Sequence, residues 1–441
     1  MNRSRLPRWL YPGIGVKRWL LLIFAGIVAL GLGGAVVLLD IYRGRNLDNV
    51  TFFYWITGAW LERPVRAAVL GSIGVLLTGI GVWGLMRSIV SPLVSRGDSV
   101  MEVLYTKRYL SRGPRIVAIG GGTGLSTLLR GLKGYSSNIT AVVAVADDGG
   151  SSGQLREQLG IVPPGDIRNC IAALADAEPL MTQLMQYRFP AGSGLDDHAF
   201  GNLFIAAMTA VTGDFEEAIR ESNRVLAVRG QVLPATSVPL SLSAILGSAR
   251  RVDGQAAITR AGEPIDRVFI EPPDVRANPE ALERILEADM IVIGPGSLFS
   301  SVLPNLLISD IRDAVAAATG LRVYVCNVAT QPGETERFTA SAHLRALFDH
   351  VGDGILDYVL VNHAPGPRRL QPRGFEPVAI DARRLEELPV VVVEEDLLDE
   401  SNTLRHDPAK LGAALMRLQQ EDRIDRQRPG RIRRATTATA G

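Results

Sequence analysis

Two adjacent carboxylates follow a strand-like run in the segment VADDGGSSGQLREQLGIVPPGDIRNC, which extends from Val145 to Cys170. Glycines and serines come directly after Asp147 and Asp148, so backbone N–H groups and small hydroxyls surround two negative charges. An acid at this place in a dinucleotide-binding fold takes ribose hydroxyls. Two acids can also hold Mg²⁺ whose shell a substrate phosphate completes. The alternative is structural, with one carboxylate capping the following turn. We expect at least one of the pair to contact a ligand.

Two glycine-rich turns, GGGTG and GPGS, end other strand-like runs, and each precedes a helical pattern. Glycine lets backbone N–H groups approach a phosphate closely, and the start of a helix favours negative charge. The candidate phosphate contacts are Gly121, Gly122, Thr123 and Gly124 in the first turn, and Gly294, Gly296 and Ser297 in the second. Neither turn is followed by Gly-Lys-Ser/Thr, which disfavours ATP hydrolysis of the P-loop type.

Several polar side chains in other loops are suited to a sugar, a base or a phosphate. The candidates are Ser151, Arg168, Asn169, His198, Asn202, Asn327 and Gln331, with Thr330 and Thr335 beside the last two. Arg168 can pair with a phosphate or carboxylate, while Asp166 near it is either a ligand contact or a helix N-cap. His198 is either a structural histidine or a contact. No pairing of a nucleophile with a base can be assembled from the spacing.

Composition excludes other kinds of site. The 441 residues carry a formal net charge of +1, which gives no general field for binding nucleic acid. The only cysteines, Cys170 and Cys326, lie in apolar runs, so we expect reduced core residues rather than a disulfide. Five scattered histidines and no CxxC pair argue against zinc. Mg²⁺ at Asp147 and Asp148 is the one metal site that the sequence suggests.

The elements that must position these residues form an α/β pattern between residues 115 and 420. Continuous apolar runs such as RIVAIG and DMIVIG alternate with helical periodicity, which predicts a Rossmann-like parallel sheet covered on both faces. Ligands bind beyond the carboxyl ends of the strands in such sheets, so the loops above should converge on one crevice. Short strand-like pieces between Val232 and Ile270 predict a small β-rich insertion.

Two uncharged segments precede this domain, at residues 19–39 and 67–86, and each is long enough to cross a bilayer as a helix. A cleaved signal peptide is the alternative for the first. Lys and Arg dominate residues 1–18 and 87–114, whereas residues 40–66 mix both signs, so we expect a two-span anchor of the inner membrane with both ends cytoplasmic. Its small residues allow close helix packing, or they reflect the glycine tolerance of spans. The arginine-rich residues 421–441 predict a disordered tail.

The loops together resemble one family. AIGGGTGLSTLLRGLK, VADDGGSSGQLR, PPGDIRN, HAFGNL, LPATSVPL, IGPGSLFSSVLPNLL, CNVATQPGET and RHDPAKL occur in the same order as in the gluconeogenesis-factor family (YvcK-like proteins). That family is related to the 2-phospho-L-lactate transferases of deazaflavin cofactor biosynthesis (CofD-like). The resemblance covers roughly Arg115 to Leu418 and omits the two apolar segments and the arginine-rich tail.

The resemblance implies a Rossmann-like fold that binds nucleotide-sugars such as UDP-N-acetylglucosamine and serves cell shape and peptidoglycan synthesis on gluconeogenic carbon. It implies phosphate contacts at the glycine loops, ribose, sugar or metal at Asp147 and Asp148, and a diphosphate or sugar contact at Arg405, for which a plain surface arginine is the alternative. We expect a non-catalytic, homo-oligomeric regulator with a cell-wall or precursor-synthesis protein as partner. The alternatives are an Mg²⁺-dependent phospholactyl transferase and a membrane scaffold with a vestigial nucleotide site.

Overall fold

The computed structural model describes residues 16–42, 62–90, 109–176, 178–363 and 374–427. The chain divides into an N-terminal unit, Met1–Tyr105, and a second unit, Thr106–Gly441, which we call the body. The predicted termini and loops that fall in residues 1–15, 43–61, 91–108 and 428–441 lie outside the described residues.

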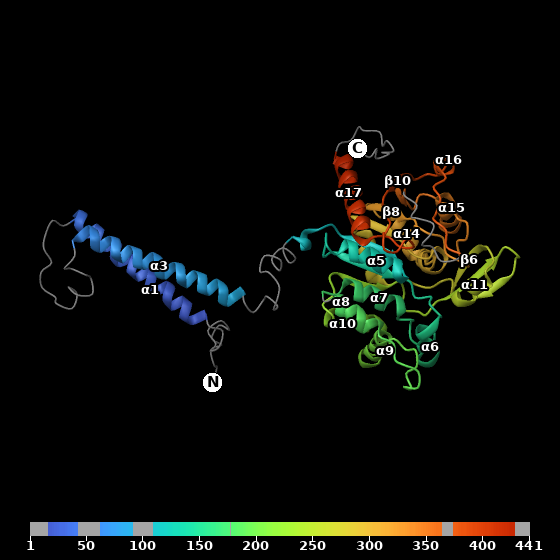
Figure 1. Cartoon of the computed structure of the whole chain (residues 1–441), viewed down its shortest axis with the longest axis horizontal. Helices are drawn as coiled ribbons and strands as arrows, with labels where there is room; N and C mark the ends of the chain where they lie inside the picture. The colour runs from blue at the N-terminus through green and yellow to red at the C-terminus, as the bar shows by residue number, and fades with distance from the viewer. Residues whose placement is uncertain (1–15, 43–61, 91–108, 177, 364–373, 428–441) are drawn as a thin grey trace. The chain divides into compact units, whose positions relative to one another are not determined.

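Among its described residues, the N-terminal unit contains two packed helices, α1 (Val16–Tyr42) and α3 (Arg63–Val90), which include both predicted spans (Figure 1). By length and composition alone, Arg18–Ala35 and Ala67–Ser88 are long and apolar enough to cross a membrane. Glycines bring the helices together: a Cβ on Gly26 would lie 2.7 Å from the backbone nitrogen of Thr78. Close packing is therefore one use of these small residues.

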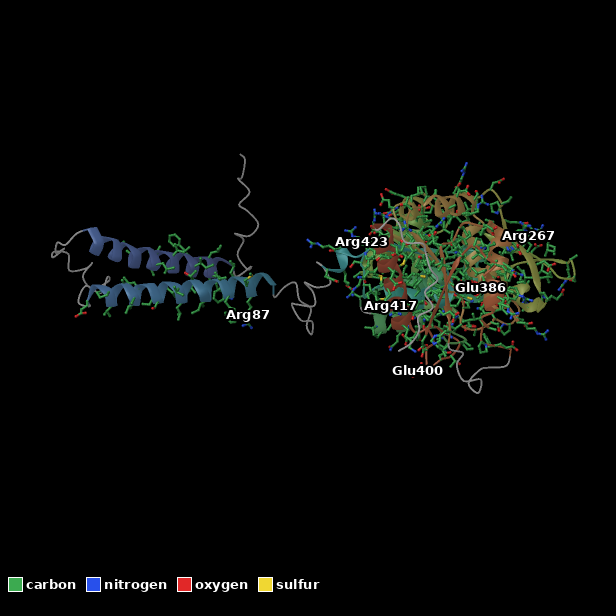
Figure 2. All side chains as sticks on the ribbon, turned by 90° about the horizontal axis from the view of Figure 1, so that it is seen from above. Arg87, Arg267, Glu386, Glu400, Arg417 and Arg423 are labelled. Carbon is green, nitrogen blue, oxygen red and sulfur yellow. The ribbon has the colours of Figure 1, made fainter. Side chains whose placement is uncertain are left out.

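One end of this hairpin carries basic and aromatic side chains. Arg18 lies over the ring of Trp19 at the start of α1, and Arg87 lies over Trp83 at the end of α3, where Figure 2 labels it. Trp19 also packs against Gly84, so the two helix ends meet. Residues of these two types are enriched where spans leave the bilayer.

Seven parallel strands form the central sheet of the body, in the order β10-β9-β8-β7-β1-β2-β3. Their bounds are β1 (Ile116–Gly120), β2 (Ile139–Val143), β3 (Gln231–Pro234), β7 (Met290–Ile293), β8 (Leu321–Val325), β9 (Tyr358–Asn362) and β10 (Val391–Glu395). Val117 of β1 pairs with Thr140 of β2 and Ile291 of β7. Every residue of β1, β2 and β7 is buried, as continuous apolar runs predict for a sheet covered on both faces.

Helices cover the sheet and connect its strands. They are η3 (Leu110–Arg112), α5 (Gly122–Leu132), α6 (Gly150–Leu159), α7 (Gly165–Leu174), α8 (Glu178–Gln186), α9 (Phe200–Thr212), α10 (Phe215–Val225), α12 (Pro279–Leu286), η4 (Leu298–Val302), α13 (Leu303–Leu306), α14 (Ser309–Ala317), α15 (Ala340–Val351), α16 (Ala382–Leu385) and α17 (Pro408–Gln427). Side-chain caps set several starts: Asp214 accepts the Glu217 N–H at 2.8 Å, and Asn278 accepts the Ala281 N–H at 3.1 Å. Cys170 and Cys326 are free and buried, as predicted.

The predicted insertion is narrower than residues 232–270. It is the antiparallel sheet β5-β4-β6, formed by β4 (Ser241–Leu246), β5 (Arg251–Asp253) and β6 (Ile265–Glu271), with α11 (Gln255–Ala261) between the last two strands. Val232 to Pro234 belong instead to β3, because their backbone pairs in parallel with β2 at the edge of the main sheet. A strand of four residues has too little pattern for sequence to assign it to one sheet or the other.

The predicted tail begins too early. Helix α17 continues past residue 420 to Gln427, and buried Asp422 forms an ion pair with Arg426 one turn later, which satisfies the carboxylate within the last turns of the helix. The arginines at residues 421–427 suggest disorder in the sequence, but these residues form the last turns of α17, where an ion pair helps to stabilise the helix. The predicted linker 87–114 likewise loses residues 87–90 to α3 and 110–112 to η3.

The contact between α5 and α17 depends on a glycine pair, Gly131 and Gly412. A Cβ on Gly131 would overlap the carbonyl oxygen of Pro408, whereas a Cβ on Gly134 would meet nothing closer than 3.9 Å. We predict that Gly131→Ala lowers the free energy of unfolding of the body by about 1–3 kcal/mol through overpacking. Gly134→Ala, the matched control, should change it by less than about 0.5 kcal/mol. Urea unfolding measures both, and equal effects would contradict the packing.

Candidate functional site

The strand order places the two glycine-rich turns side by side. From β1 the chain proceeds outward through β2 to β3, returns to β7 on the other side of β1, and continues to β10. The turn after β1 and the turn after β7 therefore flank the point where the strand order reverses. Ligands of open α/β sheets bind at such a point, beyond the carboxyl ends of the strands.

The two turns touch through their backbones. A Cβ on Gly124 would lie 2.5 Å from the carbonyl oxygen of Pro295, and a Cβ on Gly296 would lie 3.2 Å from that of Gly121. Gly122 has a φ of +65°, which a residue with a side chain rarely adopts. Glycine is thus required by space at Gly124 and by backbone conformation at Gly122.

Side chains from the loop after β8 fix the second turn. Asn327 accepts the Gly296 N–H at 3.1 Å and donates to the Gly296 carbonyl at 2.8 Å. Gln331 donates to the hydroxyl of Ser297 at 2.8 Å. Two amide side chains therefore hold the second turn at three points, and both also line the space beside it.

A cavity of about 290 Å³ lies between these loops. Its lining comprises Gly121, Gly122, Thr123, Gly124 and Thr127 from the first turn and α5, Pro295, Gly296, Ser297 and Ser301 from the second turn and η4, Asn327 to Gln331 after β8, Phe375, and Asn402 with Leu404 to His406. Backbone N–H groups, hydroxyls, amides, one phenyl ring, one imidazole and one guanidinium therefore line the same space.

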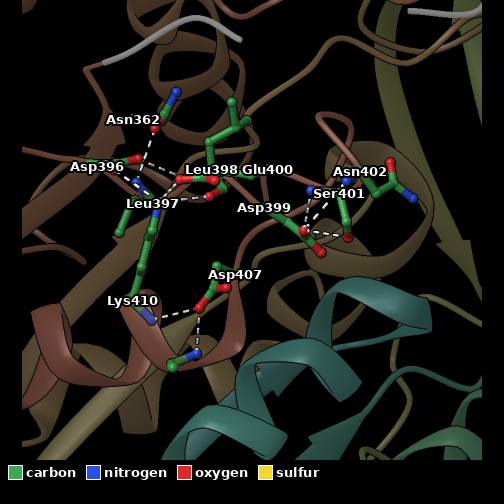
Figure 3. A network of polar contacts seen from close by, with 11 residues as sticks. Asn362, Asp396, Leu397, Leu398, Asp399, Glu400, Ser401, Asn402, Asp407 and Lys410 are labelled. Atoms are coloured by element: carbon green, nitrogen blue, oxygen red, sulfur yellow. Dashed lines mark hydrogen bonds and ion pairs between the residues drawn. The ribbon is translucent and has the colours of Figure 1, made fainter. Parts of the chain in front are cut away.

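The last wall is a loop between β10 and α17 that hydrogen bonds make rigid (Figure 3). Lys410 donates to Asp396 at 2.8 Å and to the Leu398 carbonyl at 3.1 Å, while Asp399 accepts the Ser401 N–H at 2.8 Å. Asp407 caps α17 by accepting the Lys410 N–H at 2.8 Å. This network carries Arg405 and His406 into the lining of the cavity.

Arg405 and His406 differ in environment. Arg405 is exposed, and within the described chain its guanidinium forms no salt bridge. His406 is buried with its Nε2 3.2 Å from the Cys326 carbonyl, and burial lowers its pKa to about 4. The histidine is therefore neutral at pH 7, and Arg405 brings the positive charge of this wall.

Asp166 is not the helix N-cap that the sequence allows. Pro164 is the N-cap of α7 and no side chain caps that helix. The Asp166 carboxylate instead accepts a hydrogen bond from the Gly122 N–H and lies against Gly121, behind the first turn. Burial, and then the charge of Asp147, raises the pKa of Asp166 to about 6. One of the N–H groups offered at the start of α5 is thus already bound to an acid.

The two adjacent acids have different partners. Asp147 accepts the Gly149 N–H at 3.0 Å, and burial raises its pKa. Asp148 accepts the Ala256 N–H at 2.9 Å, which ties α11 of the insertion to this turn. Among the described residues, no group of three or more His, Cys, Asp or Glu side chains is placed to hold a metal ion. Mg²⁺ at Asp147 and Asp148 stays a prediction, because that ion is usually held by one or two carboxylates while ligand phosphates and water complete its shell.

Three other predicted contacts form a buried cluster away from the cavity lining. Ser151 pairs with His198 Nδ1 at 3.1 Å and accepts from Asn202 Nδ2 at 3.0 Å. All three side chains are buried and join α6 to the start of α9. These contacts tie the start of α6, directly after Asp147 and Asp148, to α9, and a ligand contact by the three side chains stays a prediction.

The predicted site residues fall into two groups, those that line the cavity and those that do not. The cavity lining includes Gly121, Gly122, Thr123, Gly124, Gly296, Ser297, Asn327, Gln331 and Arg405, and it omits Asp147, Asp148, Ser151, Arg168, Asn169, His198, Asn202 and Gly294. Arg168 donates to Asn169 at 3.1 Å, and burial lowers its pKa. Sequence reasoning misses Phe375, Asn402 and His406. His406 could have been predicted, because it follows Arg405 directly in the motif RHDP.

These features define a Rossmann-like α/β protein with a polar cavity at the switch point of its sheet, and comparison with known proteins is consistent with this class. The family model described as 2-phospho-L-lactate transferase CofD matches residues 116–398. A solved structure of a Bacillus halodurans protein superposes with a TM-score of 0.67 at 47% identity, covering 69% of this chain and 100% of its own.

Named relatives show to which family the chain belongs. A protein from Bacillus subtilis named gluconeogenesis factor is 46% identical over 317 residues, which cover 71% of this chain and 100% of its own. A relative from Nostoc sp. is 46% identical over 432 residues, covering 93% of this chain and 92% of its own. The chain belongs to the gluconeogenesis-factor family, which is related to the CofD-type transferases. The Nostoc match exceeds the body, so the likeness reaches into the N-terminal unit, contrary to the narrower resemblance expected from the motifs.

The raised pKa of Asp166 predicts a stability cost. Ionised Asp166 destabilises the fold above pH 6, and the cost disappears as the pH falls through about 6 towards the ordinary value of 3.8. Asp166→Asn keeps an acceptor for the Gly122 N–H without the charge. We predict that the variant is about 1–3 kcal/mol more stable than the wild type at pH 8, and equally stable at pH 4.

Urea unfolding at the two pH values measures the difference. Asp353→Asn, a change at an exposed carboxylate, is the control and should alter stability by less than about 0.5 kcal/mol. A destabilised Asp166→Asn variant at pH 8 would show that the charge itself is required for the fold.

Proposed function

We propose that the body binds a nucleotide-sugar of the UDP-N-acetylglucosamine type in the switch-point cavity and acts as a regulator that couples carbon supply to cell-wall synthesis and cell shape. The observation that carries this proposal is the convergence of two glycine-rich turns and Arg405 on one cavity. Family membership as a gluconeogenesis factor supports the link to carbon metabolism.

The chemistry of the lining fits the parts of such a ligand. A diphosphate suits the free N–H groups of the first turn and the Arg405 guanidinium, which makes charge-assisted hydrogen bonds to phosphate oxygens. Phe375 offers an aromatic face for a base. Asn402, Gln331 and Thr330 offer amides and a hydroxyl for sugar hydroxyls. The ionised carboxylate of Asp166 behind the first turn favours placing the diphosphate towards Arg405.

A CofD-like transfer of a phospholactyl group, with Mg²⁺, is the second candidate function. It is favoured by the family model, which matches residues 116–398 under the name of that transferase. Asp147 is close enough to Asp166 for its charge to raise the pKa of the latter, and two such acids could share a cation with ligand phosphates. The regulator is preferred because relatives that match the whole body at 46% identity carry the name gluconeogenesis factor rather than that of the transferase.

We also propose that α1 and α3 anchor the protein in the inner membrane with the body in the cytoplasm. Their length and apolar composition support two spans. The basic and aromatic residues Arg18, Trp19, Trp83 and Arg87 at one end of the hairpin support a cytoplasmic location for that end.

Calorimetric titration of the body with UDP-N-acetylglucosamine, UDP-glucose, GDP and NAD, with and without Mg²⁺, tests the proposal. A regulator should prefer a UDP-sugar independently of Mg²⁺ and return it intact. Preference for GDP, dependence on Mg²⁺ or a chemically changed ligand would favour the transferase. Binding of none of the four would contradict both.

Arg405→Ala should weaken binding of the preferred nucleotide by about tenfold or more, because a charge-assisted hydrogen bond to phosphate is lost. Arg383→Ala, at an exposed arginine of α16, is the matched control and should leave affinity unchanged. Calorimetry measures both variants. If Arg405→Ala binds as tightly as the wild type, the proposed place of the diphosphate is wrong.

The hairpin should not contribute to ligand binding. We predict that residues 106–441 alone remain in solution and bind the nucleotide as tightly as the full chain in detergent. The shortened chain begins before residue 110 because Leu110 is buried in the body and the Ser111 carbonyl accepts a hydrogen bond from Asn138. A well-folded body with lost affinity, by calorimetry, would assign part of the site to the N-terminal unit.

A further inference from the structure

Helix α9 is apolar on all sides, although one side faces solvent. Its sequence, FGNLFIAAMTAVT, contains no charged residue, and one side is buried through Gly201, Asn202, Ile205 and Ala206. On the other side Ala207 is exposed and Val211 is 82% exposed. A helix with hydrophobic residues all round is ordinarily covered on all sides.

Helix α8 extends this apolar side. Tyr187, after the end of α8, accepts the Phe200 N–H at 2.8 Å, and Arg188 forms a β-bridge with Ala199, so the end of α8 lies against the start of α9. Leu180 of α8 is 71% exposed, and Leu184 and Tyr187 are also exposed. We call the exposed side chains Leu180, Leu184, Tyr187, Ala207 and Val211 the α8–α9 face.

A bilayer does not fit this face. The thirteen residues of α9 span about 20 Å, too short for a hydrocarbon core of about 30 Å. A helix that lies on the membrane surface carries basic residues, because the inner leaflet is anionic. Acidic residues flank α9 instead, with exposed Asp196 and Asp197 before it and exposed Asp214 after it.

We propose that the α8–α9 face is an interface that covers the same face of a second copy of this chain. In a twofold dimer each residue at the axis meets its own copy, so a charged group there would face a like charge, whereas an uncharged apolar face is complementary to itself. The rim supplies both signs, because exposed Arg188 donates to the Asp197 carbonyl at 2.7 Å and so lies beside the acids that precede α9. An apolar centre with a polar rim is typical of protein interfaces.

A buried hydrogen bond links the α8–α9 face to the segment that follows β2. Asn202, on the buried side of α9, donates at 3.0 Å to Ser151 in the first turn of α6, directly after the turn that carries Asp147. The face is thus one helix away from a loop beside the site. The interface proposal does not depend on which ligand the site binds.

Analytical ultracentrifugation of the body across a concentration series tests the interface. The solved Bacillus halodurans relative, whose whole chain matches 69% of this one, shows that such a body folds without the N-terminal unit. We expect the wild type to sediment as a dimer and Val211→Asp and Leu180→Asp to dimerise about tenfold or more weakly. Leu286→Asp, at a 49% exposed leucine of α12, is the matched control and should remain a dimer.

Circular dichroism of each variant tests whether the fold is kept. We expect it to be kept, because Val211 and Leu180 are both exposed. A monomeric wild type would overturn the proposal, as would a Val211→Asp variant that dimerises like the wild type. Flotation with vesicles of phosphatidylglycerol and phosphatidylethanolamine provides the competing outcome. If the wild-type body floats and Val211→Asp does not, the face binds lipid and the proposal is wrong.

Discussion

The contact between two backbone turns is the constraint on which the rest of the site depends. Gly124 approaches the Pro295 carbonyl so closely that a Cβ would lie 2.5 Å from it, and this is possible only because β1 and β7 are neighbours in the sheet. The contact brings the N–H groups of both turns to one cavity. The amides of Asn327 and Gln331 and the rigid loop before α17 then complete its walls.

Charges of opposite sign lie on two sides of the cavity. Arg405 brings positive charge on the side of α17, while Asp166 and Asp147 place negative charge behind the first turn, where burial raises the pKa of both. An anion in the cavity is therefore attracted to one wall and repelled by the other. Raised carboxylate pKa values at a candidate site, held at a cost to stability, are typical of functional positions.

The sequence predicts the parts of the site whose reason is local. Glycine composition and strand-to-helix turns identify both glycine-rich loops, and family resemblance adds Arg405. The sequence cannot predict hydrogen-bond partners that are distant along the chain and that only the tertiary fold brings together. Asp148 bonds to Ala256, 108 residues away, and His198 turns inward to Ser151 instead of facing the cavity. Asp166 looks like a cap because the helix start is local, whereas its real partner, Gly122, belongs to another loop.

A crystal structure of the body with UDP-N-acetylglucosamine tests the central claim most directly. The account predicts the diphosphate between the turn Gly121–Gly124 and the turn Gly296–Ser297, within hydrogen-bonding distance of the Arg405 guanidinium. The sugar should lie towards the loops after β8 and β10, and the base against Phe375, which follows β9. A ligand bound elsewhere, such as the cavity lined by Arg115 and Thr140 at the opposite end of the strands, would contradict it. An empty switch-point cavity at saturating ligand would contradict it as well.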